Sequence, residues 1–347
     1  MTLLKHRNKP SIVGAGLVAL DIVVSPKSNE FNFIGVGGTC GNVMTIMSFL
    51  GWASFPISRL SDDQNSRNLL KDLKRWGVST DYTMLEPTAD VPIIVEEIFT
   101  DKNGNSKHRF HWKICPKCGT YFDSFKSVTL PAIEPIQSMN SPPDVYFFDR
   151  ATPANIELAR HYKDLGSIIY FEPSAKADPK HLKNALLLAD VVKYSSQRFQ
   201  DSLCSTYKIK PFIEIQTFGS YGLKFATSRM KNWSEISAFI PKSLVDACGC
   251  GDWTTAGFIS EICSNGRDNL LRANAEQIRE ALRVGQAMAS WNCEFEGARG
   301  GMYSVSKPNF KKQISDILKY GNFSSTHNVN KFKEYNLISG FCPSCVV

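Results

Sequence analysis

A glycine-rich turn that ends in an acidic residue is the part of this sequence best suited to chemistry. Residues 246–252 read D-A-C-G-C-G-D and lead into a helix-like run over residues 253–264. Glycines let a backbone turn tightly and approach a ligand closely, and the first amides of a helix point outward with a partial positive charge. Such a turn can cradle an anion, and Asp252 at its mouth could accept a proton from a substrate hydroxyl. An ordinary strand-to-helix turn with an aspartate N-cap has the same short pattern, so the neighbouring motifs must decide.

An acidic residue inside an apolar stretch is a second candidate. Asp21 interrupts the apolar run of residues 12–24. A carboxylate within a buried strand is costly unless it is paired or faces a ligand. A Gly-Gly loop over residues 37–42 then opens the first clear helical run, and this loop alone is a weak signal because such loops are common at helix starts. Asp21 therefore indicates a site independently of the glycine motifs.

Four motifs in a fixed order resemble those of the PfkB/ribokinase family of carbohydrate and nucleoside kinases. Residues 246–252 resemble the D-T-x-G-A-G-D signature and keep both Asp and both Gly positions, with Ala247 and Cys250 where Thr and Ala are usual. The other similarities are G-x-x-x-x-D at residues 16–21, G-G-x-x-x-N at residues 37–42 and T-x-G-x-x-G at residues 217–222. The resemblance spans about residues 10–310. It implies an α/β fold, the ribokinase-like three-layer αβα sandwich with a mostly parallel central sheet and a small β lid.

The same resemblance assigns roles to residues of this chain. It implies ATP-dependent phosphorylation of a hydroxyl on a sugar or sugar-like small molecule, with Mg²⁺ accompanying ATP. Asp252 would be the catalytic base, and the anion hole would be formed by Gly249, Cys250 and Gly251. The acceptor would be bound by Asp21, Gly38 and Asn42, and ATP by Thr217, Gly219, Gly222, Ser195 and Gln286. Asp246 would help to order the loop or a nearby monovalent cation.

The chain departs from the family pattern in the region that would hold the metal-bound phosphates. The family's N-x-x-E would follow a strand at residues 191–194, but residues 195–198 read Ser-Ser-Gln-Arg. A cation, Arg198, thus stands where an acid would organise metal-bound water. Guanidinium matches phosphate geometry, so Arg198 could contact phosphate directly, or it could mark lost activity. A nucleoside kinase and a non-catalytic sugar or nucleotide sensor on the same fold therefore stay open as alternatives.

Two C-P-x-C knuckles stand out among the ten cysteines. Cys115 and Cys118 form the first knuckle, and Cys342 and Cys345 form the second near the end of the chain. Two such knuckles resemble those of zinc ribbons and rubredoxins and supply the four sulfurs of a tetrahedral structural Zn²⁺ site. Two unrelated pairs of free or oxidised cysteines are the alternative. A bound zinc would hold the C-terminal tail on the segment that follows the predicted lid hairpin.

Apolar strand-like runs alternate with amphipathic helical runs, which favours βα units around a mainly parallel sheet. We expect strands at residues 12–24 (one strand or a pair), 145–148, 167–171, 191–194 and 212–217, and helices at residues 42–50, 154–165 and 275–293. Lys102-Asn103-Gly104 predicts a hairpin between strands at residues 91–99 and 107–112. The predicted organisation is one kinase domain over residues 1–320, with lid strands within about residues 17–36 and 90–115, and a tail over residues 321–347 whose cysteine knuckle docks on residues 112–120.

Composition limits the class of protein. The 347 residues are 43% hydrophobic and 21% charged, which is typical of a soluble globular protein, and the net charge of +7 is mild. No Lys/Arg cluster with interleaved aromatics points to nucleic acid. Basic residues before the 12–24 run imitate a secretory signal, but Asp21 interrupts that run, and no apolar run reaches the ~18 residues of a membrane span. We therefore expect a cytoplasmic protein with no nucleic-acid or membrane partner, and a homodimer through the lid is the protein partner considered.

Overall fold

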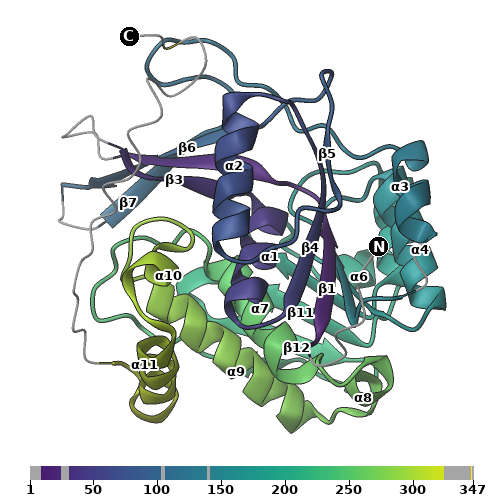
Figure 1. The fold of residues 1–347 in the computed structure, drawn as a ribbon. Coiled ribbons are helices and arrows are strands. Elements are labelled where there is room, and N and C mark those ends of the chain that lie inside the picture. Colours follow the sequence, from purple (N-terminus) through teal and green to yellow (C-terminus); the bar gives the residue numbers. More distant parts are fainter. Residues whose placement is uncertain (1–8, 25–30, 103–105, 139–140, 324–344, 346–347) are drawn as a thin grey trace.

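Two β-sheets of different size form the framework of the protein (Figure 1). The computed structural model describes residues 9–24, 31–102, 106–138, 141–323 and 345. The nine-stranded main sheet has the order β13-β12-β11-β10-β9-β8-β1-β4-β5, and the four-stranded lid sheet has the order β3-β2-β6-β7. The main-sheet strands are β1 (Ser11–Ala15), β4 (Ala53–Leu60), β5 (Thr83–Leu85), β8 (Val145–Phe148), β9 (Ile168–Phe171), β10 (Val191–Ser195), β11 (Ile213–Thr217), β12 (Leu223–Thr227) and β13 (Ser234–Ile236). The lid strands are β2 (Ala19–Val24), β3 (Phe31–Gly37), β6 (Ile93–Thr100) and β7 (Ser106–His111).

The main sheet is parallel from β5 through β11, and only β12 and β13 are antiparallel. Parallel strands are joined by crossover helices, which explains the alternation of strands and helices along the chain. The helices are α1 (Thr39–Phe49), α2 (Gln64–Arg75), α3 (Leu130–Gln137), α4 (Pro153–Asp164), α5 (Pro179–Leu188), α6 (Leu203–Thr206), α7 (Cys250–Ile262), α8 (Arg267–Arg272), α9 (Ala275–Asn292), α10 (Gly300–Ser304) and α11 (Lys307–Tyr320), with a 3₁₀ turn η1 (Gly219–Tyr221).

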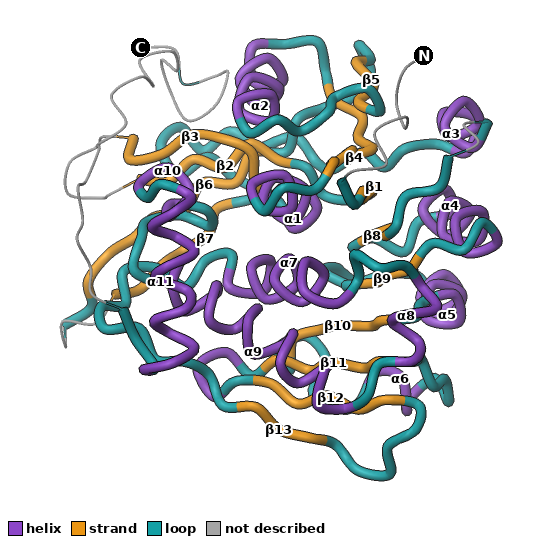
Figure 2. The backbone as a smooth tube through the Cα atoms, turned by 60° about the horizontal axis from the view of Figure 1, so that its bottom comes forward, coloured by secondary structure: helices purple, strands orange, loops and turns teal. Residues whose placement is uncertain are grey.

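Helices cover the main sheet in two groups, which Figure 2 shows on either side of β8 to β11. Helix α7 contacts α1 and α9, and α11 contacts α9, whereas α4 contacts α3 and α5. Successive side chains of a strand point to opposite faces, so each central strand feeds two hydrophobic cores. On β8, Phe147 belongs to the core that contains residues of α1, α7 and α9, and Tyr146 and Phe148 belong to the core that contains residues of α4 and α5. This arrangement confirms the expected three-layer αβα fold.

The lid sheet is built from chain segments that are distant in sequence. Strand β2 pairs antiparallel with β3 and parallel with β6, and β6 pairs antiparallel with β7. The run at residues 12–24 is therefore a strand pair, with β1 in the main sheet and β2 in the lid. The other expected strands and helices are confirmed with shifts of a few residues at their ends. The hairpin turn at residues 103–105, and the tail apart from residues 321–323 and 345, lie outside the described residues.

Among the described residues, no helix combines the length and the apolar character that crossing a bilayer requires.

Candidate functional site

The glycine-rich turn lies at the N-terminus of α7, where the sequence pattern expects it. Gly249 is the N-cap, with a left-handed φ of 76°. A Cβ at this position would lie 2.4 Å from the carbonyl oxygen of Ala298, so only glycine fits. Among the described residues, the amides of Gly249, Gly251 and Asp252 donate to no protein acceptor. Three outward amides at the start of a 13-residue helix can bind an anion.

Asp252 lies in the first turn of α7 and is buried. Its Oδ2 accepts a hydrogen bond of 2.8 Å from Nδ2 of Asn42 on α1. Burial, with a smaller contribution from Glu172, raises the pKa of Asp252 to about 8, and the bond from Asn42 opposes that rise. A carboxyl group with a pKa near neutrality can both accept and release a proton under physiological conditions. The site therefore contains a candidate acid–base group on the same helix terminus as the outward amides.

Asp21 projects from the lid strand β2, and the chain leaves room for it. A Cβ on Gly37 would lie within 1.9 Å of both carboxylate oxygens of Asp21, so residue 37 must be glycine. The Oδ1 atom is buried and has no hydrogen-bond partner among the described residues. Burial raises the pKa of Asp21 to about 7, and the charge of Arg299 opposes that rise. A buried carboxylate oxygen without a protein partner favours a ligand at this position.

Gly38 and Asn42 connect the lid to the catalytic turn. Gly38 is the N-cap of α1 with φ 75°, and a Cβ there would lie 2.6 Å from the carbonyl oxygen of Leu17. Asn42 is buried one turn into α1, where its amide group faces Asp252 on one side and Arg299 on the other. The three residues that the motifs assign to the acceptor are thus carried by β2, the start of α1 and its first turn.

Arg299 is a site residue that sequence reasoning missed. Its Nε donates to Oδ1 of Asn42 at 3.0 Å, and its Nη2 donates to Asp72 Oδ2 at 3.0 Å and to the carbonyl oxygen of Val36. Burial alone would lower the pKa of Arg299, but Tyr303 and Asp72 raise it, so the guanidinium stays charged. The Nη1 atom is buried and has no acceptor among the described residues. No motif marks this arginine, because its partners are far away in sequence.

A buried ion pair lies directly behind the anion hole. The ammonium of Lys193 on β10 donates to Oε1 of Glu172, and the hydroxyl of Thr255 donates to Oε2 of Glu172 at 2.5 Å. A Cβ on Gly251 would lie 3.6 Å from the Lys193 ammonium and 3.8 Å from Glu172, so the pair touches the turn. The sequence carries a signal for it, since both charges stand within or next to apolar strand sequences. The two charges act in opposite directions on Asp252: Glu172 raises the pKa of its carboxyl group, and Lys193 lowers it.

A second acidic cluster joins the lid to the start of the catalytic turn. Nδ1 of His108 on β7 lies 3.2 Å from Oδ1 of Asp246 and 3.6 Å from Oε1 of Glu96 on β6. Asp246 also accepts hydrogen bonds from the amides of Cys248 and Gly297, at 2.9 and 2.8 Å. Burial, followed by the charge of Asp246, raises the pKa of Glu96 to about 9. Asp246 thus orders the loop before α7, as the family resemblance suggests.

The residues expected to contact ATP lie along one edge of the main sheet and on α9. Ser195 and Thr217 are register partners at the carboxyl ends of β10 and β11. Gly219 and Gly222 follow in the η1 turn with φ of 59° and 102°, and a Cβ on Gly222 would lie 2.1 Å from the carbonyl oxygen of Ile236. Gln286 on α9 is buried, and its Oε1 has no hydrogen-bond donor among the described residues. Of the five residues expected to bind ATP, Ser195 and Thr217 therefore lie side by side on neighbouring strands.

The replaced N-x-x-E segment forms a tight turn after β10. The amide of Arg198 donates to the carbonyl oxygen of Ser195 at 3.0 Å, and the amide of Gln197 donates to the Ser195 hydroxyl at 3.2 Å. The side chain of Arg198 is exposed. Cys250, where the family has Ala, lies with its Sγ 3.1 Å from the Sγ of Cys293. One departure thus lies in an exposed turn after β10, and the other lies at the start of α7 against α9.

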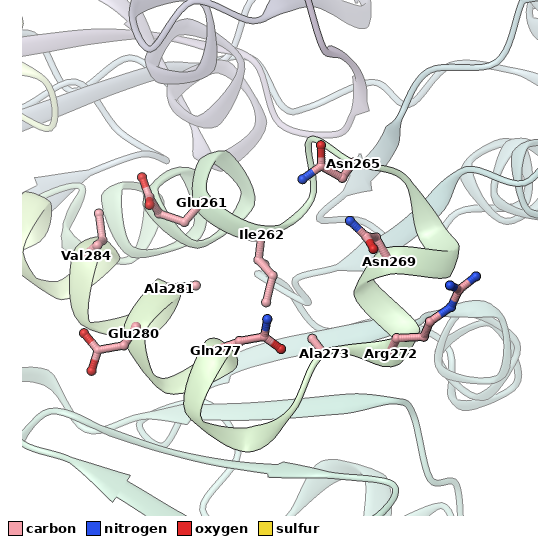
Figure 3. A pocket seen from close by; sticks show the side chains of 10 residues that line it. All are labelled: Glu261, Ile262, Asn265, Asn269, Arg272, Ala273, Gln277, Glu280, Ala281 and Val284. Atoms are coloured by element: carbon pink, nitrogen blue, oxygen red, sulfur yellow. The ribbon is translucent and has the colours of Figure 1, made fainter.

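A cavity of about 430 Å³ lies elsewhere, between the C-terminal half of α7, α8 and α9 (Figure 3). It is lined by residues such as Glu261, Arg272 and Gln277, and by none of the predicted site residues. Asp252 lies in the first turn of α7, whereas Glu261 lies in its last turn. The cavity is therefore at the opposite end of α7 from the catalytic turn and has no part in the chemistry considered for it.

Comparisons with known proteins find sugar and nucleoside kinases that are similar to this chain in sequence and fold. No family model matches the sequence. The chain is 25% identical over 306 residues to a ribokinase of Bacillus subtilis, covering 83% of this chain and 94% of the ribokinase. It is 22% identical over 275 residues to a nucleoside kinase of Methanothermobacter thermautotrophicus, covering 76% of this chain and 80% of that kinase.

Solved structures show the same fold. Aminoimidazole riboside kinase from Salmonella enterica, complexed with aminoimidazole riboside and an ATP analogue, matches with a TM-score of 0.66 and 18% identity over 88% of this chain and all of that chain. A fructokinase double mutant from Vibrio cholerae O395, with fructose, ADP and potassium ion bound, matches with a TM-score of 0.65 and 17% identity over 88% of this chain and 98% of that chain. With the ordered motifs and the fold, these similarities show distant homology to the ribokinases and nucleoside kinases of the PfkB/ribokinase family.

Proposed function

We propose that this protein is an ATP-dependent kinase that phosphorylates a hydroxyl of a sugar or sugar-like small molecule, with Asp252 as the base. One observation carries the proposal. A buried carboxylate whose pKa is raised to about 8 lies in the first turn of α7, beside helix amides that donate to no acceptor among the described residues. A base and an anion hole on one helix terminus are what transfer of a phosphoryl group to an alcohol needs.

Each site residue has a separate role in the proposed reaction. Asp252 accepts the proton of the acceptor hydroxyl, and Asn42 holds its carboxylate in place through the 2.8 Å hydrogen bond. The turn of Gly249, Cys250 and Gly251 directs the amides of Gly249, Gly251 and Asp252 toward the transferring group, where they stabilise its charge. Asp21 binds acceptor hydroxyls through its Oδ1, which has no hydrogen-bond partner in the described part of the chain, and Gly38 lets the start of α1 approach the acceptor closely.

ATP would supply the phosphoryl group, and Mg²⁺ would neutralise its negative charge. The residues on the sheet edge fit a nucleotide in their donor chemistry, since the hydroxyls of Ser195 and Thr217 end neighbouring strands and the glycines at 219 and 222 let the loop pass close to a ligand. Gln286 would contact the base of the nucleotide with its Oε1, for which the described ranges of the chain supply no donor. Asp246 would hold the loop and, by analogy with relatives, lie near a monovalent cation.

The loss of the N-x-x-E acid favours one second candidate, a sugar or nucleotide sensor without turnover. Ser195 and Arg198 occupy the turn in which the family carries the acid that organises metal-bound water, and Arg198 is exposed at that rim. A weaker magnesium site slows phosphoryl transfer more than it weakens binding of the acceptor. A nucleoside as acceptor is the alternative within the kinase class.

A coupled assay of ADP release over a panel of sugars, sugar derivatives and nucleosides tests the proposal. At least one acceptor should give ADP release that depends on Mg²⁺ and that falls by about 10²–10⁴-fold in Asp252→Asn. The matched control is Asp164→Asn at the exposed end of α4, which should keep the wild-type rate. Binding of ATP and an acceptor by calorimetry with no turnover on any panel member would reject the kinase in favour of the sensor.

A further inference from the structure

The first cysteine knuckle has the backbone of a preformed metal-binding turn. Ile114 and Tyr121 form an isolated antiparallel bridge that closes the loop between them. Within it, the amide of Gly119 donates to the carbonyl oxygen of Cys115 at 3.0 Å, and the amide of Cys115 donates to that of Thr120 at 2.9 Å. Gly119 has φ 76°, and nothing lies within 4 Å of where its Cβ would be. Glycine is therefore needed here for its conformation rather than for space.

A third thiol reaches this turn from the other end of the chain. The Sγ of Cys345 lies 3.4 Å from the Sγ of Cys115, although the two residues are 230 positions apart. The ligand sulfurs of Cys115, Cys118 and Cys345 all lie within 4.8 Å of one another. Cys115 and Cys345 are only 2% and 6% exposed, so the last described residue of the chain is held against the knuckle.

The sulfur spacing fits a shared metal ion and not a disulfide. A disulfide would bring the two sulfurs to about 2.05 Å. Two thiolates on one tetrahedral Zn²⁺, each about 2.3 Å from the ion, lie roughly 3.8 Å apart. The observed 3.4 Å between Cys115 and Cys345 is close to that value. Soft thiolates with no carboxylate in the set select zinc over magnesium or calcium.

We propose that Cys115, Cys118 and Cys345 bind a structural Zn²⁺ that fastens the C-terminus of the chain to the segment after lid strand β7. Cys342 lies outside the described residues, and its role as a fourth thiolate stays a prediction from the C-P-S-C spacing of the sequence. With that fourth thiolate the ion would have no open coordination position, so it would cross-link the chain and take no part in phosphoryl transfer.

Metal content and stability test this proposal independently of any kinase assay. We expect about one zinc per full-length chain by mass spectrometry of the protein purified in reducing buffer. Cys115→Ser and Cys345→Ser should each lose most of it, whereas Lys117→Ser in the same knuckle and Cys263→Ala in the core should retain it. Replacement by Co²⁺ should give the absorption spectrum of a tetrahedral thiolate complex. Loss of the thiolate pattern in Cys342→Ser would support its role as fourth ligand, and an unchanged spectrum would overturn that assignment.

A chelator experiment on the wild-type chain guards against variants that fail to fold. Removal of zinc should lower the melting temperature by about 5 °C, because binding energy of a structural metal is folding energy. The same chelator should not affect Cys345→Ser, which has already lost the ion. Less than about half an equivalent of zinc in the wild-type protein, or full zinc content in Cys115→Ser, would overturn the proposal.

Discussion

The acceptor side and the nucleotide side of the candidate site are built in different ways. On the acceptor side, Asp252, Asn42, Arg299 and Asp72 form a continuous chain of hydrogen bonds, and all four are buried. On the nucleotide side, Ser195 and Thr217 are partly exposed at strand ends, and the side chain of Arg198 is exposed. One half of the site is fixed before any ligand arrives, and the other half is open.

This difference predicts how strongly each side of the site responds to substitution. A buried network holds its groups in one geometry and makes each of them costly to change. An exposed turn tolerates substitution, and it is here that Arg198 stands where the family resemblance predicts an acid. In the proposed kinase, the acceptor side is therefore the preorganised part of the site, and the nucleotide side carries the departure from the family pattern. The following variants test that contrast.

The largest effect should come from Asp252→Asn. The amide keeps the size of the side chain and removes the base, so kcat should fall by about 10²–10⁴-fold while KM for the acceptor changes little. Steady-state kinetics by ADP release would measure both constants. A fall in kcat of less than tenfold would mean that another group accepts the proton.

Arg299→Met should destabilise the fold strongly. The substitution leaves Asp72 buried without its cation and frees Oδ1 of Asn42, which should cost about 3–5 kcal/mol in free energy of unfolding. Urea unfolding would measure the change. Arg160→Met, at an exposed ion pair on α4, is the matched control and should change stability by less than about 1 kcal/mol. Equal losses of unfolding free energy in the two variants would show that the buried network stabilises the fold no more than an exposed ion pair does.

Glu96→Gln should flatten the pH dependence of stability. The pKa of Glu96 is raised from 4.5 to about 9, so the folded state binds this proton more tightly than the unfolded chain does. Its contribution to stability is complete at low pH and is lost as the pH rises from about 5 to 9. Melting temperatures across that range should fall less steeply in Glu96→Gln than in the wild type. The exposed Glu235→Gln should keep the wild-type slope, and an unchanged slope in Glu96→Gln would contradict its burial as a neutral acid.

The smallest effect should come from restoring the family acid on the nucleotide side. The double variant Ser195→Asn/Arg198→Glu should lower the Mg²⁺ concentration for half-maximal activity several-fold and leave KM for the acceptor unchanged. Gln197→Glu places an acid one position away in the same exposed turn and should not have this effect. A change in acceptor KM in the double variant would mean that the two sides of the site are not separable.

Sequence reasoning predicted the fold correctly because it follows local rules, and the same rules single out candidate residues for the acceptor side, whose roles stay a proposal. Alternating strands and helices predict the sheet. Asp21 lies in an apolar run and Asp252 at a helix start, and a buried carboxylate is costly unless it has a partner or a ligand. Arg299 could not be predicted, because its partners Asn42 and Asp72 are 257 and 227 positions away and its own segment has no motif. Lys193 could be noticed in the sequence as a charge within an apolar strand. Its partner Glu172 could not be assigned, because it follows the neighbouring strand β9 and only the order of the strands in the sheet brings the two together.

The pH profile of kcat/KM is the most direct test of the claim that Asp252 is the base of a preorganised site. This profile reports the pKa of the free enzyme's essential groups. With an acceptor from the panel, kcat/KM should rise about tenfold per pH unit at low pH and level off near pH 8, where Asp252 loses its proton. The residual kcat/KM of Asp252→Asn should not show this rise with pH. A flat wild-type profile between about pH 6 and 9, or the same rise in Asp252→Asn, would contradict the account.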